Sequence, residues 1–371
     1  MNTTNHAGAD ALLNLLRGGP DTSRAQLYRL LKDQPDAAGI IAHLAQAFSA
    51  VASAPPKVVL PIPGYEKVAN DIVANGLGFF ELGDMRRKNH SDGRPWQCID
   101  TELEGREVVV VGGWINDRDL METYRTAYNA VMWKAKKLTV VICHHGDARQ
   151  ERAQEKGEGV DALYASHMFT SIPHASGRQN EVVLVDIHAD AVLGFFQGAG
   201  MAATNVPALG LLIEKIVERE FGGKCKLGSP DAGRAKIVEK KSEQLGLGTP
   251  AIANKGRRGA KTNTYGFLGT VRNKPVLVSD DLAVSFGSAM GAAQVFRKKG
   301  AKDMILACAH LVAPVNPKTG ESYVRDLVES GLYRKLYVTD SLPHAYELQA
   351  KFPDFIVVEP LGPILVPYLL G

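Results

Sequence analysis

From Lys57 onward, short runs of β-branched and other apolar residues alternate with amphipathic segments. The apolar runs read KVVLPI, REVVVVGG, LTVVICHH, EVVLVDIH, PVLVSDD, DMILACAH and KLYVTD. Between them, YEKVANDIVANG, DLMETYRTAYNAVMWKAKK and SAMGAAQVFRKKG carry apolar residues at helical spacing. Such alternation is typical of parallel strands covered by helices on both faces. The pattern therefore predicts an α/β fold with parallel sheets flanked by helices.

The first part of the chain follows a different pattern. Leu27, Leu30 and Leu31, and then Ile40 to Val51, recur at helical spacing before SAPP ends the pattern. We therefore expect a small helical N-terminal extension at 1–56. The length of the remainder fits two lobes, with an N-terminal domain at 57–200 and a C-terminal domain at 201–371.

Composition narrows the function classes. The chain has 371 residues, with 45% hydrophobic residues, 22% charged residues and a formal net charge of +3. This small charge argues against a dedicated nucleic-acid binder, and the absence of long apolar runs argues against a membrane span. Four isolated cysteines and the absence of a secretory pattern fit a reducing compartment. We therefore expect a cytoplasmic protein with neither a nucleic-acid nor a membrane partner.

Ligands of open parallel sheets bind where strands end, so the polar segments after the apolar runs are the candidate sites. In VDIHAD, His188 stands between two carboxylates and can serve a Mg²⁺ ion, although a capped turn explains the same residues. In SPDAGRAK, Asp231 allows either a ligand site or a helix cap.

Two further segments carry positive charge. Arg149, Gln150 and Arg152 in GDARQER suit phosphate or base contacts, or equally a solvated helix start. Lys255 and Arg257 in NKGRRGAK suit a flexible basic loop that closes over a polyphosphate, or equally a surface loop. The adjacent histidines of CHHG have no suitably spaced third ligand, which favours a structural role.

The stretch VLVSDDLAVSFGSAM holds the strongest single motif. Asp280 and Asp281 follow a strand pattern and are suited to grip a sugar diol. The small residues that open the next helix are suited to hold a phosphate on backbone N–H groups. Phe286 stands in the middle of this loop, where a large side chain is unexpected.

Taken in order, these segments resemble the ribose-phosphate diphosphokinases (phosphoribosyl pyrophosphate synthetases) from about Lys57 to about Pro343. The matching segments are INDRDLME, HGDARQER, VDIHADAVLGFF, SPDAGRAK, NKGRR and VSDDLAVSFGSA. The resemblance implies two type I phosphoribosyltransferase-like domains, homo-oligomers that are dimers or hexamers, and the cofactor Mg²⁺. It also implies transfer of the β,γ-diphosphate of ATP to the anomeric hydroxyl of ribose 5-phosphate, giving phosphoribosyl pyrophosphate and AMP.

By position, the resemblance also assigns roles to residues. Lys255, Arg257 and His188 are implied as catalytic, and His188 and Asp231 as metal-binding. ATP contacts are implied for Asp92, Arg149, Gln150, Glu151 and His188. The residues implied at the acceptor are Asp231, Asp280, Asp281, Ser285, Phe286, Gly287 and Ser288.

Departures from the family pattern concentrate at the acceptor loop, where Val284 replaces an Asp and Phe286 a small residue. Three readings follow. The first is the reaction with ribose 5-phosphate. In the second, a larger acceptor that contains ribose 5-phosphate, such as ADP-ribose, receives the diphosphate in NAD salvage, and Phe286 closes the old phosphate pocket or stacks on the acceptor. The third is a non-catalytic subunit that regulates true synthetases, against which the retained His188 and Lys255 argue.

Overall fold

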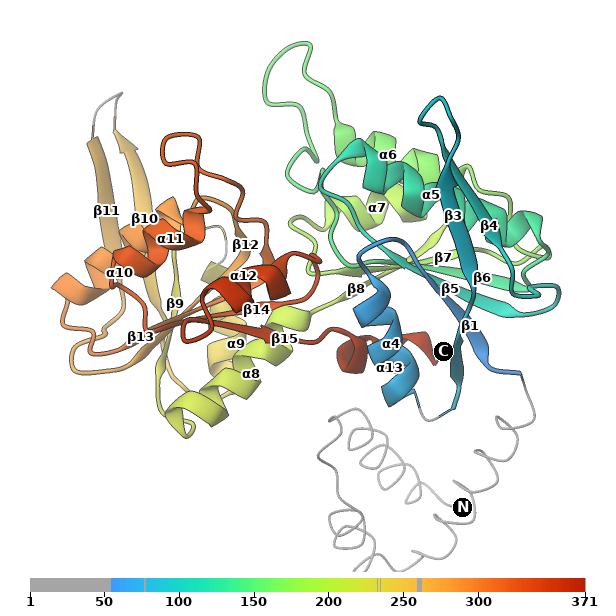
Figure 1. The fold of residues 1–371 in the computed structure, drawn as a ribbon. Helices are drawn as coiled ribbons and strands as arrows, with labels where there is room; N and C mark the ends of the chain where they lie inside the picture. Colours follow the sequence, from blue (N-terminus) through green and yellow to red (C-terminus); the bar gives the residue numbers. More distant parts are fainter. Residues whose placement is uncertain (1–54, 77, 232, 234, 259–261, 371) are drawn as a thin grey trace, which may run out of the picture.

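The computed structural model describes residues 55–370, with gaps at 77, 232, 234 and 259–261. It forms two α/β units side by side, each built on its own sheet (Figure 1). The predicted fold class is therefore confirmed. The expected extension at 1–56 falls, up to residue 54, outside the described residues.

The first unit is built on a six-stranded, entirely parallel sheet in the order β2-β1-β5-β6-β7-β8. Its strands are β1 (Lys57–Pro61), β2 (Phe80–Leu82), β5 (Glu107–Gly112), β6 (Lys137–Ile142), β7 (Glu181–Val185) and β8 (Ala202–Val206). A separate antiparallel hairpin consists of β3 (Met85–Asn89) and β4 (Pro95–Ile99). The central strands are buried on both faces because helices cover both, which explains their unbroken runs of valine.

One core cluster joins a face of this sheet to α5 (Asp117–Met132), α6 (Asp161–Thr170) and α7 (Ala191–Gly198). The opposite face packs against α4 (Glu66–Asn75) and α13 (Gly362–Leu369). The helix α5 begins where Asn116 accepts a hydrogen bond from the Asp119 amide at 3.0 Å.

The second unit is built on a seven-stranded sheet in the order β11-β10-β9-β12-β13-β14-β15. Its strands are β9 (Lys226–Ser229), β10 (Ala251–Arg258), β11 (Thr262–Leu268), β12 (Val276–Ala283), β13 (Met304–Leu311), β14 (Lys335–Thr339) and β15 (Ile356–Glu359). Only β10 and β11 pair antiparallel among them. One face packs against α10 (Gly287–Lys298), α11 (Tyr323–Glu329) and α12 (Ala345–Lys351), and the other against α8 (Ala208–Phe221) and α9 (Ala235–Gln244).

The chain crosses between the units twice, once after β8 and once after β15. Strand β8 completes the first sheet beyond residue 200, and the chain then enters α8, which packs on β12, β13 and β14. At the C-terminus, α13 returns to pack on α4 of the first unit. Two segments that the sequence pattern placed with the C-terminal domain, β8 and α13, thus lie on the first sheet.

None of the described helices has both the length and the apolar character needed to cross a membrane.

The return of α13 depends on a close approach of two backbones. A Cβ placed on Gly362 would lie 2.4 Å from the Asp71 Cβ and 2.8 Å from the Ile72 backbone nitrogen, so only glycine fits without a shift. We predict that Gly362→Ala lowers the free energy of unfolding by about 1–3 kcal/mol, as overpacking does. Urea denaturation followed by circular dichroism measures this loss.

The matched control is Gly194→Ala in α7, where an added Cβ meets nothing within 4 Å. This change should be neutral or raise stability by about 0.5–1 kcal/mol, because alanine favours a helix interior. Equal stability of the two variants would contradict the close approach.

Candidate functional site

A cavity of about 590 Å³ lies between the two units, beside the carboxyl ends of β7 and β12. It is lined by the turn after β7, by α8 and α9, and by the end of β12; six of its residues are His188, Asn205, Leu209, Ile237, Lys241 and Asp280. In open α/β sheets this edge is where ligands bind, and a boundary between units is a common site location.

His188 reaches across the boundary to the second unit. Its Nδ1 lies 2.6 Å from Oδ2 of Asp281, whose side chain is only 6% exposed, whereas the His188 side chain is 38% exposed. The turn that carries His188 begins at Asp186, which has a left-handed φ of +41°. Two hydrogen bonds hold this turn in place: the Leu209 amide donates to the Asp186 carboxylate at 2.7 Å, and the Ile187 amide to Asn205 at 3.1 Å.

The two adjacent carboxylates of β12 have different surroundings. The strand continues to Ala283 instead of ending before Asp280, so consecutive side chains point to opposite faces. Asp280 lines the cavity, whereas Asp281 is buried against His188. The two carboxylates thus differ in their further neighbours but stay close to each other, since the Asp281 amide donates to Asp280 Oδ1 at 3.0 Å.

Desolvation raises the pKa of the Asp280 carboxyl well above its usual range, and the nearby charges of Asp281 and Asp231 raise it further. Asp231 follows β9, the neighbour of β12 in the sheet, so acidic groups from two strands share this edge. A bound cation or sugar hydroxyls would relieve the crowding of negative charge.

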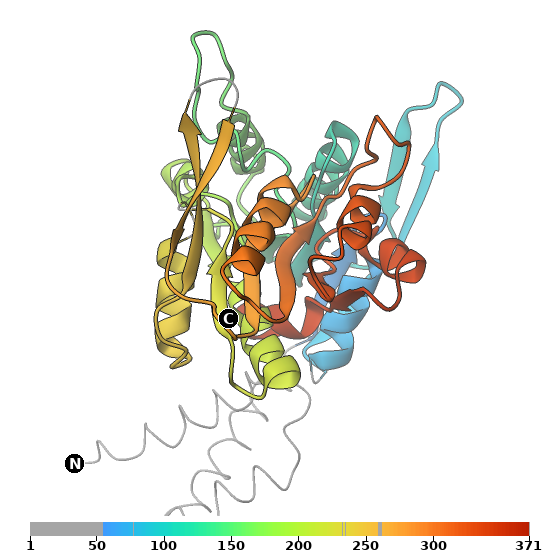
Figure 2. The ribbon, with the colours of Figure 1, turned by 90° about the vertical axis from the view of Figure 1, so that its left-hand side faces the viewer.

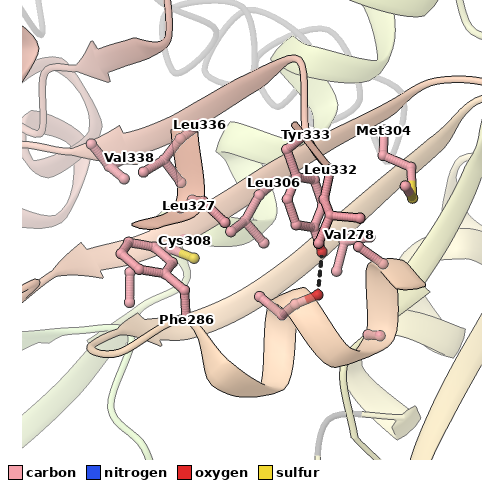
Figure 3. Close-up of a cluster of buried hydrophobic side chains, with 14 of the residues drawn as sticks. Val278, Phe286, Met304, Leu306, Cys308, Leu327, Leu332, Tyr333, Leu336 and Val338 are labelled. Atoms are coloured by element: carbon pink, nitrogen blue, oxygen red, sulfur yellow. Dashed lines mark hydrogen bonds between the residues drawn. The ribbon is translucent and has the colours of Figure 1, made fainter. Parts of the chain in front are cut away.

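The loop that follows β12 presents small polar residues to solvent while its phenylalanine points inward. Phe286 is 5% exposed and packs in the core near Cys308 and Val338 (Figure 3). Its backbone has a left-handed φ of +57°, and its carbonyl accepts the Met290 amide of α10 at 2.8 Å. The expectation that the ring closes the phosphate pocket or stacks on the acceptor is therefore wrong, because the ring fills the core. Ser285, Gly287 and Ser288 surround the start of α10, with Ser285 and Gly287 exposed.

The residues expected to contact ATP lie on two different elements of the first unit. One is the loop after β6, at the same sheet edge as the turn that carries His188, and the other is the β3–β4 hairpin. Arg149, Gln150 and Glu151 lie in the turn-rich loop after β6, which is the neighbour of β7, and they do not begin a helix. Asp92 lies at the tip of the β3–β4 hairpin, where it accepts a hydrogen bond from the Arg94 amide at 3.0 Å. Figure 2 shows that hairpin rising at one side of the molecule and β10–β11 at the other.

The expected flexible basic loop forms an antiparallel hairpin instead. Lys255 and Arg257 lie on β10, opposite Tyr265 and Asn263 of β11. The backbone amides and carbonyls of this segment thus pair across the hairpin, which is the structural reason that the loop prediction fails. The tip of the hairpin, at 259–261, lies outside the described residues.

The adjacent histidines of CHHG are buried. The His144 ring centroid lies 4.7 Å from that of His310, and the His145 ring centroid 4.5 Å from that of Trp114. Burial lowers the pKa of His145 to about 3 and that of His144 well below its usual range. Neutral, buried rings packed against aromatic groups agree with a structural role. Among the described residues, no three His, Cys, Asp or Glu side chains form a ready-made metal cage.

The sequence did not indicate the walls contributed by α8 and α9. Leu209, Ile237 and Lys241 face the cavity only because α8 and α9 meet the turn after β7. Their spacing is that of ordinary amphipathic helices, so no local signal distinguishes them. Asn205 lies inside β8, and its contact with Ile187 depends on the pairing of two strands.

Comparison with known proteins identifies the fold and the enzymes that the chain resembles. A crystal structure of phosphoribosylpyrophosphate synthetase from Mycobacterium smegmatis matches with a TM-score of 0.71, covering 85% of this chain and 98% of that one at 23% identity. The family model for the N-terminal domain of ribose phosphate pyrophosphokinase matches residues 59–172.

Two curated relatives extend the match beyond that domain. A ribose-phosphate pyrophosphokinase of Campylobacter jejuni is 26% identical over 280 residues, covering 75% of this chain and 84% of the relative. One of Corynebacterium glutamicum is 29% identical over 288 residues, covering 76% and 82%. The chain thus resembles the ribose-phosphate pyrophosphokinases over about three quarters of its length. Its fold is that of the Mycobacterium smegmatis synthetase structure.

The core position of Phe286 generates a stability prediction. Phe286→Ala should lower the free energy of unfolding by about 3–5 kcal/mol, because it removes a buried ring and leaves a cavity. Chemical denaturation monitored by circular dichroism measures the change.

Val315→Ala is the control for Phe286→Ala, because Val315 is 63% exposed and its truncation should change stability by less than about 0.5 kcal/mol. A Phe286→Ala protein as stable as this control would show that the ring does not anchor the loop.

Proposed function

We propose that the protein transfers the β,γ-diphosphate of ATP to the anomeric hydroxyl of ribose 5-phosphate. The anomeric oxygen attacks the β-phosphorus, the bond from that phosphorus to the α-phosphate oxygen breaks, and AMP leaves. The likeness to curated ribose-phosphate pyrophosphokinases supports a diphosphokinase-type transferase. Homo-oligomeric assembly as a dimer or hexamer stays a prediction, as does the contact of Asp92 with ATP.

The observation that carries this proposal is the meeting of the two halves of the site in one cavity. His188, which the resemblance assigns to ATP, comes from the first unit. Asp280, which it assigns to the acceptor, comes from the second. A reaction between two substrates requires this juxtaposition, since orientation of both reactants lowers the barrier.

The donor set fits a magnesium–nucleotide complex. Mg²⁺ is commonly held through one or two protein ligands, with waters and substrate phosphates completing its shell, so a full protein cage is not required. His188 and Asp231 would hold the ion, with the cavity-lining Asp280 beside them. When bound, Mg²⁺ supplies Lewis-acid polarisation of the phosphates.

The remaining steps belong to the chain's own residues. Arg149 and Gln150 bind the nucleotide beside the end of β6. Ser285, Gly287 and Ser288, at the exposed start of α10, hold the 5-phosphate on hydroxyls and amides. Asp280 accepts hydrogen bonds from the ribose hydroxyls. Lys255 and Arg257 stabilise the negative charge that develops as the diphosphate moves.

A larger acceptor containing ribose 5-phosphate, such as ADP-ribose, is the second candidate. The cavity favours it, because about 590 Å³ continues from Asp280 between α8 and α9. Its far wall combines apolar side chains, among them Leu209 and Ile237, with the cations Lys240 and Lys241. That wall suits a further group that has both an apolar face and negative charge.

We predict that Mg²⁺, ATP and ribose 5-phosphate yield AMP and a product heavier than the acceptor by one diphosphate group. Mass spectrometry and an AMP assay follow the reaction, with ADP-ribose in a parallel arm. AMP formed only with ADP-ribose would replace the first candidate by the second. No AMP with either acceptor would exclude both.

We predict that Lys255→Ala lowers kcat by at least about 10²-fold to 10³-fold while ATP binding stays nearly unchanged, because Lys255 acts on charge that appears in the transition state. Calorimetric ATP binding and steady-state kinetics separate the two effects. Lys274→Ala is the control, since Lys274 is exposed at the opposite end of β12. A Lys255→Ala rate within a few-fold of wild type would remove Lys255 from the mechanism.

A further inference from the structure

The buried carboxylate of Asp281 contacts His188, one of the residues that the turn after β7 brings to the reaction cavity. Its Oδ2 lies 2.6 Å from His188 Nδ1, and its side chain is only 6% exposed. A sugar-binding carboxylate needs an open face, and Asp280, one residue earlier, supplies it at the cavity. The position of Asp281 therefore suits an interaction with His188 better than one with the acceptor.

The backbone around His188 is already fixed on both sides. The carboxylate of Asp186 accepts from the Leu209 amide, and its carbonyl oxygen lies 3.3 Å from His310 Nε2, which comes from β13 of the second unit. The following amide, that of Ile187, is held by Asn205. These contacts fix neither the rotation of the His188 ring nor which of its two nitrogens carries the proton. The Asp281 carboxylate acts on both.

We propose that Asp281 is a positioning residue that fixes the His188 ring with Nδ1–H on its carboxylate, so that Nε2 is the nitrogen available to the magnesium–nucleotide complex. An ionised carboxylate accepts hydrogen bonds, so its contact selects the tautomer that donates from Nδ1. The other ring nitrogen then keeps a lone pair on the cavity side. The same arrangement, a carboxylate behind a histidine, orients metal-binding imidazoles in proteins.

Only one part of this proposal rests on the proposed function, namely that Nε2 of His188 serves the magnesium–nucleotide complex. The contact between the two units and the tautomer are properties of the protein alone. An experiment on the protein without substrates therefore tests the pair, and a kinetic experiment tests its use.

Nitrogen-15 NMR of histidine-labelled protein reads the tautomer directly. We expect His188 in the wild type to carry its proton on Nδ1, and in Asp281→Ala to show the mixture of tautomers typical of a free imidazole. Lys274→Ala, at the opposite and exposed end of β12, is the control and should leave the His188 signals unchanged. His188 signals that are the same in wild type and Asp281→Ala would overturn the proposal.

Kinetics separate positioning from sugar binding. With the acceptor that supports AMP formation, Asp281→Ala should lower kcat about 10-fold to 100-fold and change the acceptor KM by less than about 3-fold, the size found for residues behind metal ligands. Adding Asp281→Ala to His188→Ala should lower kcat no further, since both changes remove the same interaction. A raised acceptor KM with unchanged kcat, or losses that multiply, would make Asp281 an acceptor ligand.

The Asp281→Asn variant keeps the proposal testable if Asp281→Ala does not fold. The amide oxygen of Asn can still accept from Nδ1–H, so this variant should keep the His188 tautomer and recover part of the lost kcat. An Asp281→Asn protein no better than Asp281→Ala, with native circular dichroism, counts against positioning. Should the wild type form no AMP with either acceptor, the proposed function fails while the NMR result still decides the pair.

Discussion

The contact between the turn after β7 and the strands β12 and β13 sets the geometry of the whole site. It joins His188 to Asp281 and Asp186 to His310, while the Tyr65 hydroxyl donates to the Ser341 carbonyl at 3.2 Å. Under the proposed function, His188 at the nucleotide and Asp280 at the acceptor come from different units, so a shift between the units would change the distance between the reacting atoms. Small shifts of this kind cost large factors in rate. Buried hydrogen bonds across the boundary resist such shifts, because breaking one leaves an unsatisfied polar group.

The loop after β12, which the sequence assigns to the acceptor, is likewise held in place by a buried contact. A left-handed φ at a non-glycine residue costs on the order of 1–3 kcal/mol, and Phe286 adopts one. Burial of a phenylalanine side chain contributes about 1.5–3 kcal/mol, which offsets that strain. The ring thus anchors the loop in the core, and the loop can present Ser285 and Gly287 to solvent in one conformation.

The sequence predicted the features that depend on local pattern and missed those that depend on contacts between distant segments. Runs such as VVVV in β5 indicate a strand buried on both faces, and His188 stands out because it follows such a strand. The pair Asp280–Asp281 reads as one sugar-binding motif, yet only Asp280 lines the cavity, whereas Asp281 contacts His188. The inward position of Phe286 and the return of α13 to α4 each require a core that no local pattern describes.

The argument about which acceptor binds shifts from the loop after β12, which the sequence indicated, to the cavity wall formed by α8 and α9. Because the Phe286 ring lies in the core, its replacement of a small residue does not fill the space for a 5-phosphate. The altered loop therefore supplies no steric argument against ribose 5-phosphate. The argument for a larger acceptor comes instead from the cavity between α8 and α9, whose wall a small sugar phosphate would leave largely uncontacted. Buried apolar surface adds affinity only where the ligand covers it, so under the proposed function this wall is where the two acceptors would be discriminated.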